Sequence, residues 1–290
     1  MESLPQGTTV GRVELTVKDA ATIGDFYTDI VGLQRLTQEG DSIDLGVDGT
    51  TLLRLVEEPL SRPRGRSQAG LFHLAIRSPD RFPLAFAYRR LRNNGHLTGA
   101  SDHHVSEALY GRDPEDNGIE IYRDRSPDRW ERTDDGGIKI VTWPLDLDDL
   151  EAMTEAASQP IDQLPLGTDI GHVHLEVTDL ERARAFYVDL LGFDIKATYP
   201  GALFIAAGDY HHHIGLNVWN ERREPVGEQG LRRFEIRLPD SDVLDAIADR
   251  LKGTSLGLTE ILDTSDDAMT VADPDGIEIS LTSEGMSADE

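Results

Sequence analysis

Three side chains in this sequence have the types and the spacing needed to hold a metal ion. His73 and His172 lie in the segments "LFHLAI" and "HVHLEV", and Glu120 lies between Ile119 and Ile121 in "NGIEIY". Because a β-strand sends alternate side chains to opposite faces, each of the three points away from the apolar face of its segment. Two neutral imidazoles and one carboxylate with open coordination positions suit Fe(II) used for oxygen chemistry. The sequence therefore predicts a metal site, provided the fold brings these segments together.

Each of these residues alone has a simpler interpretation. A single glutamate in such a strand commonly faces water, and a single histidine on a strand is more often a hydrogen-bonded core or surface residue than a ligand. His174 also shares a face with His172 and competes with it as a ligand. The metal interpretation therefore depends on finding the three residues at related positions of a repeat.

The sequence contains an internal duplication. The segments "VGRVELTVKDAATIGDFYTDIVGL" (10–33) and "IGHVHLEVTDLERARAFYVDLLGF" (170–193) match at a constant offset of 160. Both predict a strand and then an amphipathic helix, with Asp19 or Asp179 as the N-cap and Gly32 or Gly192 at the end. The repeated unit therefore begins with a strand and a helix.

Two weaker copies begin at "LFHLAIRSPD" (71–80) and "RRFEIRLPDSD" (232–242), and they end in "DPEDNGIEI" and "DPDGIEI". The fold class predicted is α+β, with four βαβββ modules that form two curled mixed sheets. Modules one and two are expected over 1–125 and modules three and four over 169–282. A connector over 126–168 with a short strand and an acidic helix near 148–157 separates them, and an acidic tail follows over 283–290.

The first strands of the four modules share one pattern. Their apolar faces are expected to pack against the helices, and these faces are Val13, Leu15 and Val17; Phe72, Leu74 and Ile76; Val173, Leu175 and Val177; and Phe234, Ile236 and Leu238. The opposite face begins with Arg12, His73, His172 and Arg233 at one equivalent position. The last strands of modules two and four place Glu120 and Glu278 at a second equivalent position of the repeat. Only a pairing of module two with module three brings two histidines together with a glutamate. The other two modules are expected to be a scaffold, in which Glu278 has no histidines beside it and binds no metal.

The charge balance excludes several classes of partner. The chain has 54 acidic and 28 basic residues, a formal charge of −26 and only four lysines. Such a surface repels nucleic acid and anionic membranes. It also resembles the surfaces of proteins from salt-loving organisms, so halophily is a hypothesis.

We expect a soluble, unexported, cytoplasmic protein with no membrane partner, and the sequence leaves open whether it forms a homo-oligomer. Zero cysteines exclude disulfides and thiolate ligands.

The combined motifs "GHVHLEV", "FYVDLLGF", "FHLAI", "DPEDNGIEIY" and "YHHHIGLN" resemble the vicinal oxygen chelate superfamily. Within it the chain is similar to extradiol, ring-cleaving dioxygenases of the catechol 2,3-dioxygenase type. The resemblance implies the glyoxalase/bleomycin resistance-like fold and an Fe(II), occasionally Mn(II), cofactor. It maps the metal ligands onto His172, His73 and Glu120. The second ligand and the glutamate lie before the first ligand in this sequence, whereas many family members pair the last two modules.

The resemblance also implies residues that act beside the metal. It places an acid–base histidine at His212, although the run "HHHIGL" leaves His211 and His213 open, and strand alternation would send these two together and His212 the other way. The stretch "DHHVSEALY" supplies Asp102, His103 and Tyr110, of which His103 and Tyr110 are expected to hydrogen-bond the substrate or oxygen.

The implied function is extradiol cleavage of a small aromatic diol by O2. A glyoxalase-like isomerase or lyase is an alternative, but such sites usually need a second carboxylate, and none is apparent in "HHHIGLNVW". A non-catalytic, antibiotic-binding protein of the same fold is a second alternative, which requires a cleft and no metal triad.

Overall fold

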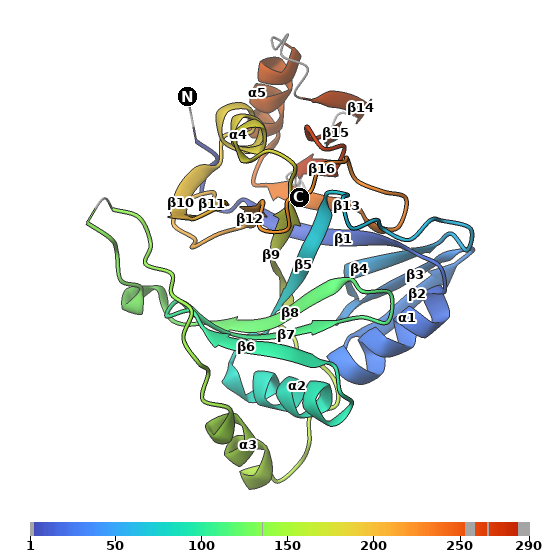
Figure 1. Ribbon diagram of the computed structural model, residues 1–290, viewed down its shortest axis with the longest axis vertical. Helices are drawn as coiled ribbons and strands as arrows, with labels where there is room; N and C mark the ends of the chain where they lie inside the picture. The colour runs from blue at the N-terminus through green and yellow to red at the C-terminus, as the bar shows by residue number, and fades with distance from the viewer. Residues whose placement is uncertain (1–2, 135, 253–258, 266, 284–290) are drawn as a thin grey trace, which may run out of the picture. The chain divides into compact units, whose positions relative to one another are not determined.

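The computed structural model contains four βαβββ modules, as the repeats predict (Figure 1). It describes residues 3–134, 136–252, 259–265 and 267–283. Apart from Ser283, the expected acidic tail lies outside the described residues, as does the expected helix end at Gly253.

Each module consists of a strand, a helical segment and three further strands. Module one has β1 (Thr9–Val17), α1 (Ala20–Phe26), the π-helical turn η1 (Tyr27–Val31), β2 (Gln34–Glu39), β3 (Ser42–Val47) and β4 (Thr50–Glu57). Module two has β5 (Gly70–Arg77), α2 (Arg81–Asn93), β6 (Leu97–Asp102), β7 (Ser106–Arg112) and β8 (Gly118–Asp124). Module three has β9 (Asp169–Glu176), α4 (Leu180–Arg184), the π-helical turn η3 (Ala185–Leu190), β10 (Asp194–Tyr199), β11 (Ala202–Ala206) and β12 (Ile214–Asn217). Module four has β13 (Gly230–Leu238), α5 (Ser241–Lys252), β14 (Glu260–Thr264), β15 (Ala268–Ala272) and β16 (Glu278–Ser283).

The predicted helix caps are confirmed. The Asp19 carboxylate accepts a hydrogen bond from the Thr22 backbone N–H at 2.9 Å, and Asp179 caps α4 in the same way. Gly32 has a φ of 97°, which is the left-handed conformation that favours glycine at a helix end. The sequence did not predict that the last turn is π-helical in both copies.

The strands form two mixed eight-stranded sheets. One sheet consists of the strands of modules one and four, and the other consists of the strands of modules two and three. In modules two, three and four the last strand pairs with the first strand in parallel, and the neighbouring strands pair antiparallel. This parallel pairing places the first and last strands of a module side by side. These are the strands on which the sequence analysis predicts the metal ligands.

The chain divides into two compact units. Unit 1 comprises Met1–Val13, Arg62–Leu71 and His172–Glu290, and unit 2 comprises Glu14–Ser61 and Phe72–Gly171. In both units the predicted apolar faces of the first strands are buried, with relative exposures of 0–1%. Phe72 is the exception to that prediction, because its side chain is partly exposed and lines a cavity.

Within unit 2, α2 packs against β8, and the connector helix α3 (Leu147–Ala156) packs against α2 (Figure 1). The acidic helix expected near 148–157 is therefore confirmed. The connector also contains a short 3₁₀ turn, η2 (Pro127–Arg129). Its expected strand is reduced to isolated bridges, one between Arg132 and Ile138 and one between Asp102 and Trp143. No helix among the described residues is both long and apolar enough to span a bilayer.

Candidate metal centre

His73 and Glu120 meet in unit 2, as the repeat pattern predicts. The parallel pairing of β5 and β8 sets Ala75 opposite Glu120, so His73 precedes that pair on the same face of the sheet. The His73 Nε2 and Glu120 Oε2 atoms lie 2.9 Å apart, and both side chains are buried. A buried carboxylate and a buried imidazole are costly to leave without a charge or hydrogen-bond partner. The pair therefore offers two adjacent ligand atoms in a protected place.

Gly118 allows β8 to approach β5 this closely. A Cβ atom at Gly118 would lie 1.9 Å from the Phe72 carbonyl oxygen and 3.2 Å from the His73 Cα atom. The distance to the Phe72 carbonyl oxygen is far below van der Waals contact, so a side chain at Gly118 would force the strands apart. The glycine of the "DNGIEI" turn thus contributes directly to the position of Glu120.

A cavity of about 300 Å³ opens beside His73 within unit 2. Its residues come from β5 to β8 and from the connector, and they are Phe72, His73, Thr98, Ser101, His103, Tyr110, Gly111, Arg112, Gly118, Ile119 and Thr142. The sequence reasoning identified the histidines and Tyr110. It assigned Phe72 to the apolar face, and it missed the three hydroxyl residues and Arg112, because their positions carry no repeat signal. For Arg112 alone a signal existed, since it is two residues after Tyr110 on one strand face.

Tyr110 and His103 form a hydrogen-bonded pair in the cavity wall. The Nδ1 atom of His103 is 2.6 Å from the Val141 carbonyl oxygen, which can only accept a hydrogen bond, so Nδ1 carries the proton. In the neutral ring Nε2 is then an acceptor, and it lies 2.7 Å from the Tyr110 hydroxyl. Burial, together with the negative charge of Glu120, raises the pKa of Tyr110 well above its ordinary value. The phenol therefore keeps its proton as a hydrogen-bond donor at neutral pH.

Asp102 is held away from this pair. Its carboxylate accepts two hydrogen bonds from Arg125 at 2.7 Å and one from the His104 backbone N–H at 2.8 Å. Burial alone would raise the pKa of Asp102, but the hydrogen bonds from Arg125 lower it below its ordinary value. Asp102 therefore fixes the turn that carries His103, and it is not among the residues that line the cavity.

His172 lies in unit 1 on β9 and is buried. The ring of His212 packs against it with centroids 4.1 Å apart, and the ring of His211 lies 6.4 Å from it. The Nδ1 atoms of His211 and His212 are 2.6 Å apart, so one donates a hydrogen bond to the other. Of the three consecutive histidines, His212 is thus the one whose ring lies nearest to that of His172, at an interplanar angle of 47°.

One expectation about the neighbouring histidines needs correction. The three histidines precede β12 (Ile214–Asn217) and do not belong to a strand, so the predicted strand alternation among them was wrong. His213 instead accepts a hydrogen bond from the Ala207 backbone N–H at 3.2 Å. His174, the competing ligand, packs against Phe204 and Trp219. Room for its ring exists because residue 215 is glycine, where a Cβ would lie 2.8 Å from the ring.

Module four replaces the histidine–glutamate pair with an ion pair. Arg233 Nε lies 3.8 Å from Glu278 Oε2, and the two residues are directly opposite each other on β13 and β16, whereas Glu120 lies opposite Ala75 in module two. Glu278 is therefore not stranded, because a guanidinium supplies the positive charge near its carboxylate. This arrangement fits the expectation that module four does not bind a metal, since arginine offers no lone pair to one.

Comparison with known proteins agrees with this architecture. The family model of the Glyoxalase/Bleomycin resistance protein/Dioxygenase superfamily matches residues 9–121 and 169–281. The chain belongs to this superfamily. Its two matched segments each span two of the βαβββ modules, which accounts for the offset of 160 between them.

Among its relatives is the catechol-2,3-dioxygenase of Bacillus subtilis (strain 168), which is 40% identical over 282 residues, covering 94% of this chain and 96% of that protein. A solved structure from Bacillus subtilis subsp. subtilis str. 168 covers all of this chain and 89% of its own, with a TM-score of 0.65 and 14% identity. Glyoxalase I from Zea mays has a TM-score of 0.57 and 15% identity, covering 96% of this chain and 92% of that one. At such identities the two structures show the shared fold alone.

Proposed function

We propose that this superfamily member is an extradiol dioxygenase that opens a catechol-type ring beside its two hydroxyl groups with O2 at a non-haem Fe(II). The observation that carries the proposal is the buried His73–Glu120 pair beside a cavity, in a chain 40% identical to a catechol-2,3-dioxygenase. The substrates would be a small aromatic diol and O2, and Mn(II) is the alternative metal.

The metal would be held by His73, Glu120 and His172. Each is buried and offers one atom that can ligate a metal ion, either an imidazole nitrogen or a carboxylate oxygen. His172 comes from module three, whose strands belong to the same sheet as those of module two. Two imidazoles and one carboxylate are a donor set that Fe(II) accepts while keeping open positions. The set would leave the ion a net charge of +1, which favours an anionic catecholate.

When bound, the metal would hold the two catechol oxygens and O2 close together and link them electronically, which removes the entropy of a three-body encounter. His212, whose ring packs against that of His172, would take a proton from a catechol hydroxyl and return it later in ring opening. The His103–Tyr110 pair would hydrogen-bond the substrate or O2, and the Tyr110 hydroxyl would turn its one proton from His103 to the ligand to do so. Asp102 would act as a positioning residue through the turn that carries His103.

The isomerase alternative has less support. It usually requires a second carboxylate from module three, and β12 (Ile214–Asn217) contains neither aspartate nor glutamate. The binding-protein alternative would need only the cavity, and it gives no reason for a histidine–glutamate pair at the cavity wall. Both alternatives are distinguished from the proposal by the same experiment.

The test is oxygen uptake with catechol after anaerobic loading with Fe(II) in about 2 M KCl, a concentration that screens surface charge. We expect one O2 consumed per ring and a yellow hydroxymuconic semialdehyde, which contains all atoms of both substrates. Glu120→Gln should lose bound iron and lower turnover at least about 100-fold. Glu278→Gln, which changes the last-strand glutamate of module four, is the matched control and should retain the bound iron and the turnover. Tyr110→Phe should retain iron and lower turnover about 10-fold or more.

The other outcomes separate the alternatives. Stoichiometric iron that depends on Glu120 without oxygen uptake would favour an isomerase or a different substrate. Absence of bound metal in the wild type would favour the binding protein. Equal losses in Glu120→Gln and Glu278→Gln would mean that the two modules do not differ as proposed.

A further inference from the structure

The cavity beside His73 is lined by one guanidinium, that of Arg112, which the proposed chemistry does not use. Tyr110 and Arg112 lie two residues apart on β7, so their side chains leave the same face of the strand about 7 Å from each other. Both line the cavity, together with the hydroxyl residues Thr98, Ser101 and Thr142. A catechol whose hydroxyl groups reach the His73 end of the cavity would therefore direct its opposite ring edge toward polar groups.

Arg112 is oriented by the turn that precedes β8. Its Nη1 atom donates hydrogen bonds to the Asp116 carbonyl oxygen at 2.9 Å and to the Asp116 carboxylate at 3.1 Å. That turn is itself fixed, because the buried Asp113 carboxylate accepts the backbone N–H groups of Glu115 and Asn117, both at 2.9 Å. The guanidinium is thus anchored through one nitrogen only.

The other edge of the guanidinium is available to a ligand. Among the residues that the structure describes, none accepts a hydrogen bond from Arg112 Nε or Nη2, and the side chain is 48% exposed. The Nε and Nη2 donors of an arginine form a planar fork that matches the two oxygens of a carboxylate. An anchored fork loses little conformational freedom on binding, which favours its use as a recognition group.

We propose that the substrate is a catechol that carries a carboxylate on a short side chain at the ring edge opposite the diol, and that Arg112 binds this carboxylate. The inference rests on the proposed function and names the substrate class of that site. A net charge of −26 repels an anionic substrate, and the Arg112 guanidinium would offset that repulsion at the cavity. Asp116 neutralises part of the Arg112 charge, but its side chain is 83% exposed and therefore well screened.

The experiment compares two substrates that differ in charge and hardly in shape, 3,4-dihydroxyphenylacetate and 3,4-dihydroxyphenylacetamide. For each, kcat/KM is measured with iron-loaded protein, and Kd is measured by calorimetry without O2, so that the binding result does not depend on turnover. The wild type should favour the carboxylate over the amide by about 10-fold in both quantities, the size expected for one charge-assisted contact at a half-exposed site. This preference should shrink in molar KCl.

Three variants test the residue. Arg112→Gln should bring the carboxylate-to-amide ratio close to one, and Arg112→Lys, which keeps the charge without the fork, should give an intermediate ratio. Arg89→Gln on the exposed face of α2 is the control and should keep the wild-type ratio. Because each ratio is taken within one variant, a general loss of folding or metal cancels.

The outcomes separate this inference from the proposed function. The inference about Arg112 is wrong if catechol is cleaved without any preference for the carboxylate, or if the preference persists in Arg112→Gln. The dioxygenase proposal would still hold in either case, and the role of Arg112 would be limited to stabilising its turn. If no catechol is cleaved, the proposed function fails, and the calorimetric ratio still decides whether Arg112 selects a carboxylate.

Discussion

At the scale of single residues, one buried carboxylate recurs in the turn before the last strand of modules two and four. Asp113 accepts hydrogen bonds from two backbone N–H groups, and Asp273 does the same with Asp275 and Ile277 and also accepts one from the Tyr187 hydroxyl at 3.0 Å. Burial raises the pKa of Asp113 to about 6 and that of Asp273 to about 7. These turns set where β8 and β16 begin, so their protonation affects the strands that carry Glu120 and Glu278.

Stability should therefore depend on pH through Asp273. Its folded-state pKa of about 7 lies above the ordinary value of 3.8, so the folded state binds this proton more tightly than the unfolded state does. The stabilisation is complete below pH 4 and is lost as the pH rises through 7. Asp273→Asn keeps the oxygen acceptor and has no charge. The free energy of unfolding of Asp273→Asn relative to wild type should rise between pH 4 and 8, measured by urea denaturation.

The exposed Asp245 on α5 provides the comparison for that experiment. Asp245→Asn should differ from the wild type by a constant amount across the same pH range. A constant difference for Asp273→Asn as well would mean that Asp273 is ionised in the folded protein throughout, with its backbone hydrogen bonds outweighing burial.

The residues of the candidate centre differ in how far the sequence could predict them. His73 and Glu120 could be placed on one face, because strand alternation and the repeats fix which residues share a face. The ring contact between His172 and His212 could not, because the three histidines lie outside a strand and their directions depend on local packing. Thr142 could not be assigned to the cavity either, since it is brought there by non-local pairing of the connector.

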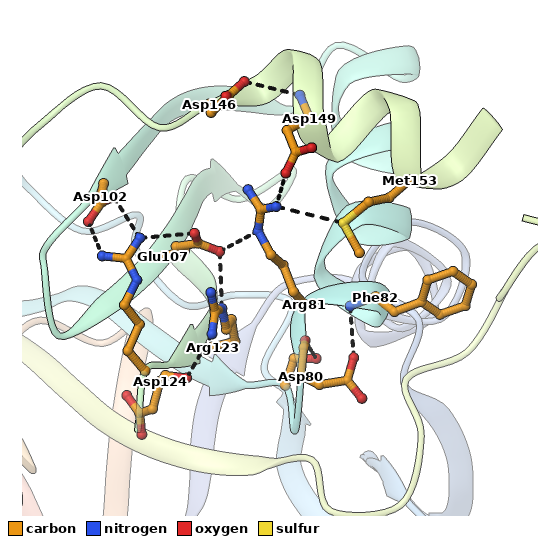
Figure 2. A network of polar contacts seen from close by, with 12 residues as sticks. Asp80, Arg81, Phe82, Asp102, Glu107, Arg123, Asp124, Asp146, Asp149 and Met153 are labelled. Carbon is orange, nitrogen blue, oxygen red and sulfur yellow. Dashed lines mark hydrogen bonds and ion pairs between the residues drawn. The ribbon is translucent and has the colours of Figure 1, made fainter. Parts of the chain in front are cut away.

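At the scale of elements, a network of ion pairs fixes the connector to module two (Figure 2). The buried Glu107 on β7 accepts hydrogen bonds from Arg81 at 2.7 Å and from Arg123 and Arg125 at 3.0 Å. Arg81 also contacts Asp149 of α3, and Arg125 contacts Asp102 beside the turn of His103. Burial opposes ionisation of Glu107, but its arginine partners keep its pKa below the ordinary value. The network therefore links α3, α2 and the turn that carries His103.

Removing Glu107 should cost more than removing a surface carboxylate. Glu107→Gln removes the carboxylate that three partly buried arginines share, while Asp149 and Asp102 still pair with two of them, so the free energy of unfolding should fall by about 2 kcal/mol. Glu131→Gln is the control, because Glu131 pairs with Lys139 at the surface and should leave the urea midpoint unchanged. Similar midpoints for both variants would show that the network adds no stability beyond that of an exposed pair.

The sequence could predict the order of these elements better than their ends. Each module was expected as βαβββ, because hydrophobic periodicity and capping residues are local signals. The π-helical turns at Tyr27–Val31 and Ala185–Leu190 have no such local signal and depend on how each helix end packs. The connector was expected to hold a short strand, whereas only isolated bridges form in it, one of them between Asp102 and Trp143.

At the scale of the whole molecule, the excess of acidic side chains should make stability depend on salt. A net charge of −26 on 290 residues generates self-repulsion that favours the unfolded chain. Screening shortens the Debye length from about 10 Å at 0.1 M salt to about 3 Å at 1 M, so most of the repulsion should disappear over this range. We expect the melting temperature measured by calorimetry to rise with KCl, with most of the rise below about 1 M.

Sucrose at equal osmolality is the control for solvent exclusion, because it stabilises folded proteins without screening charge. If KCl raises the melting temperature no more than sucrose does, self-repulsion is not what limits stability, and the halophilic interpretation of the composition is wrong.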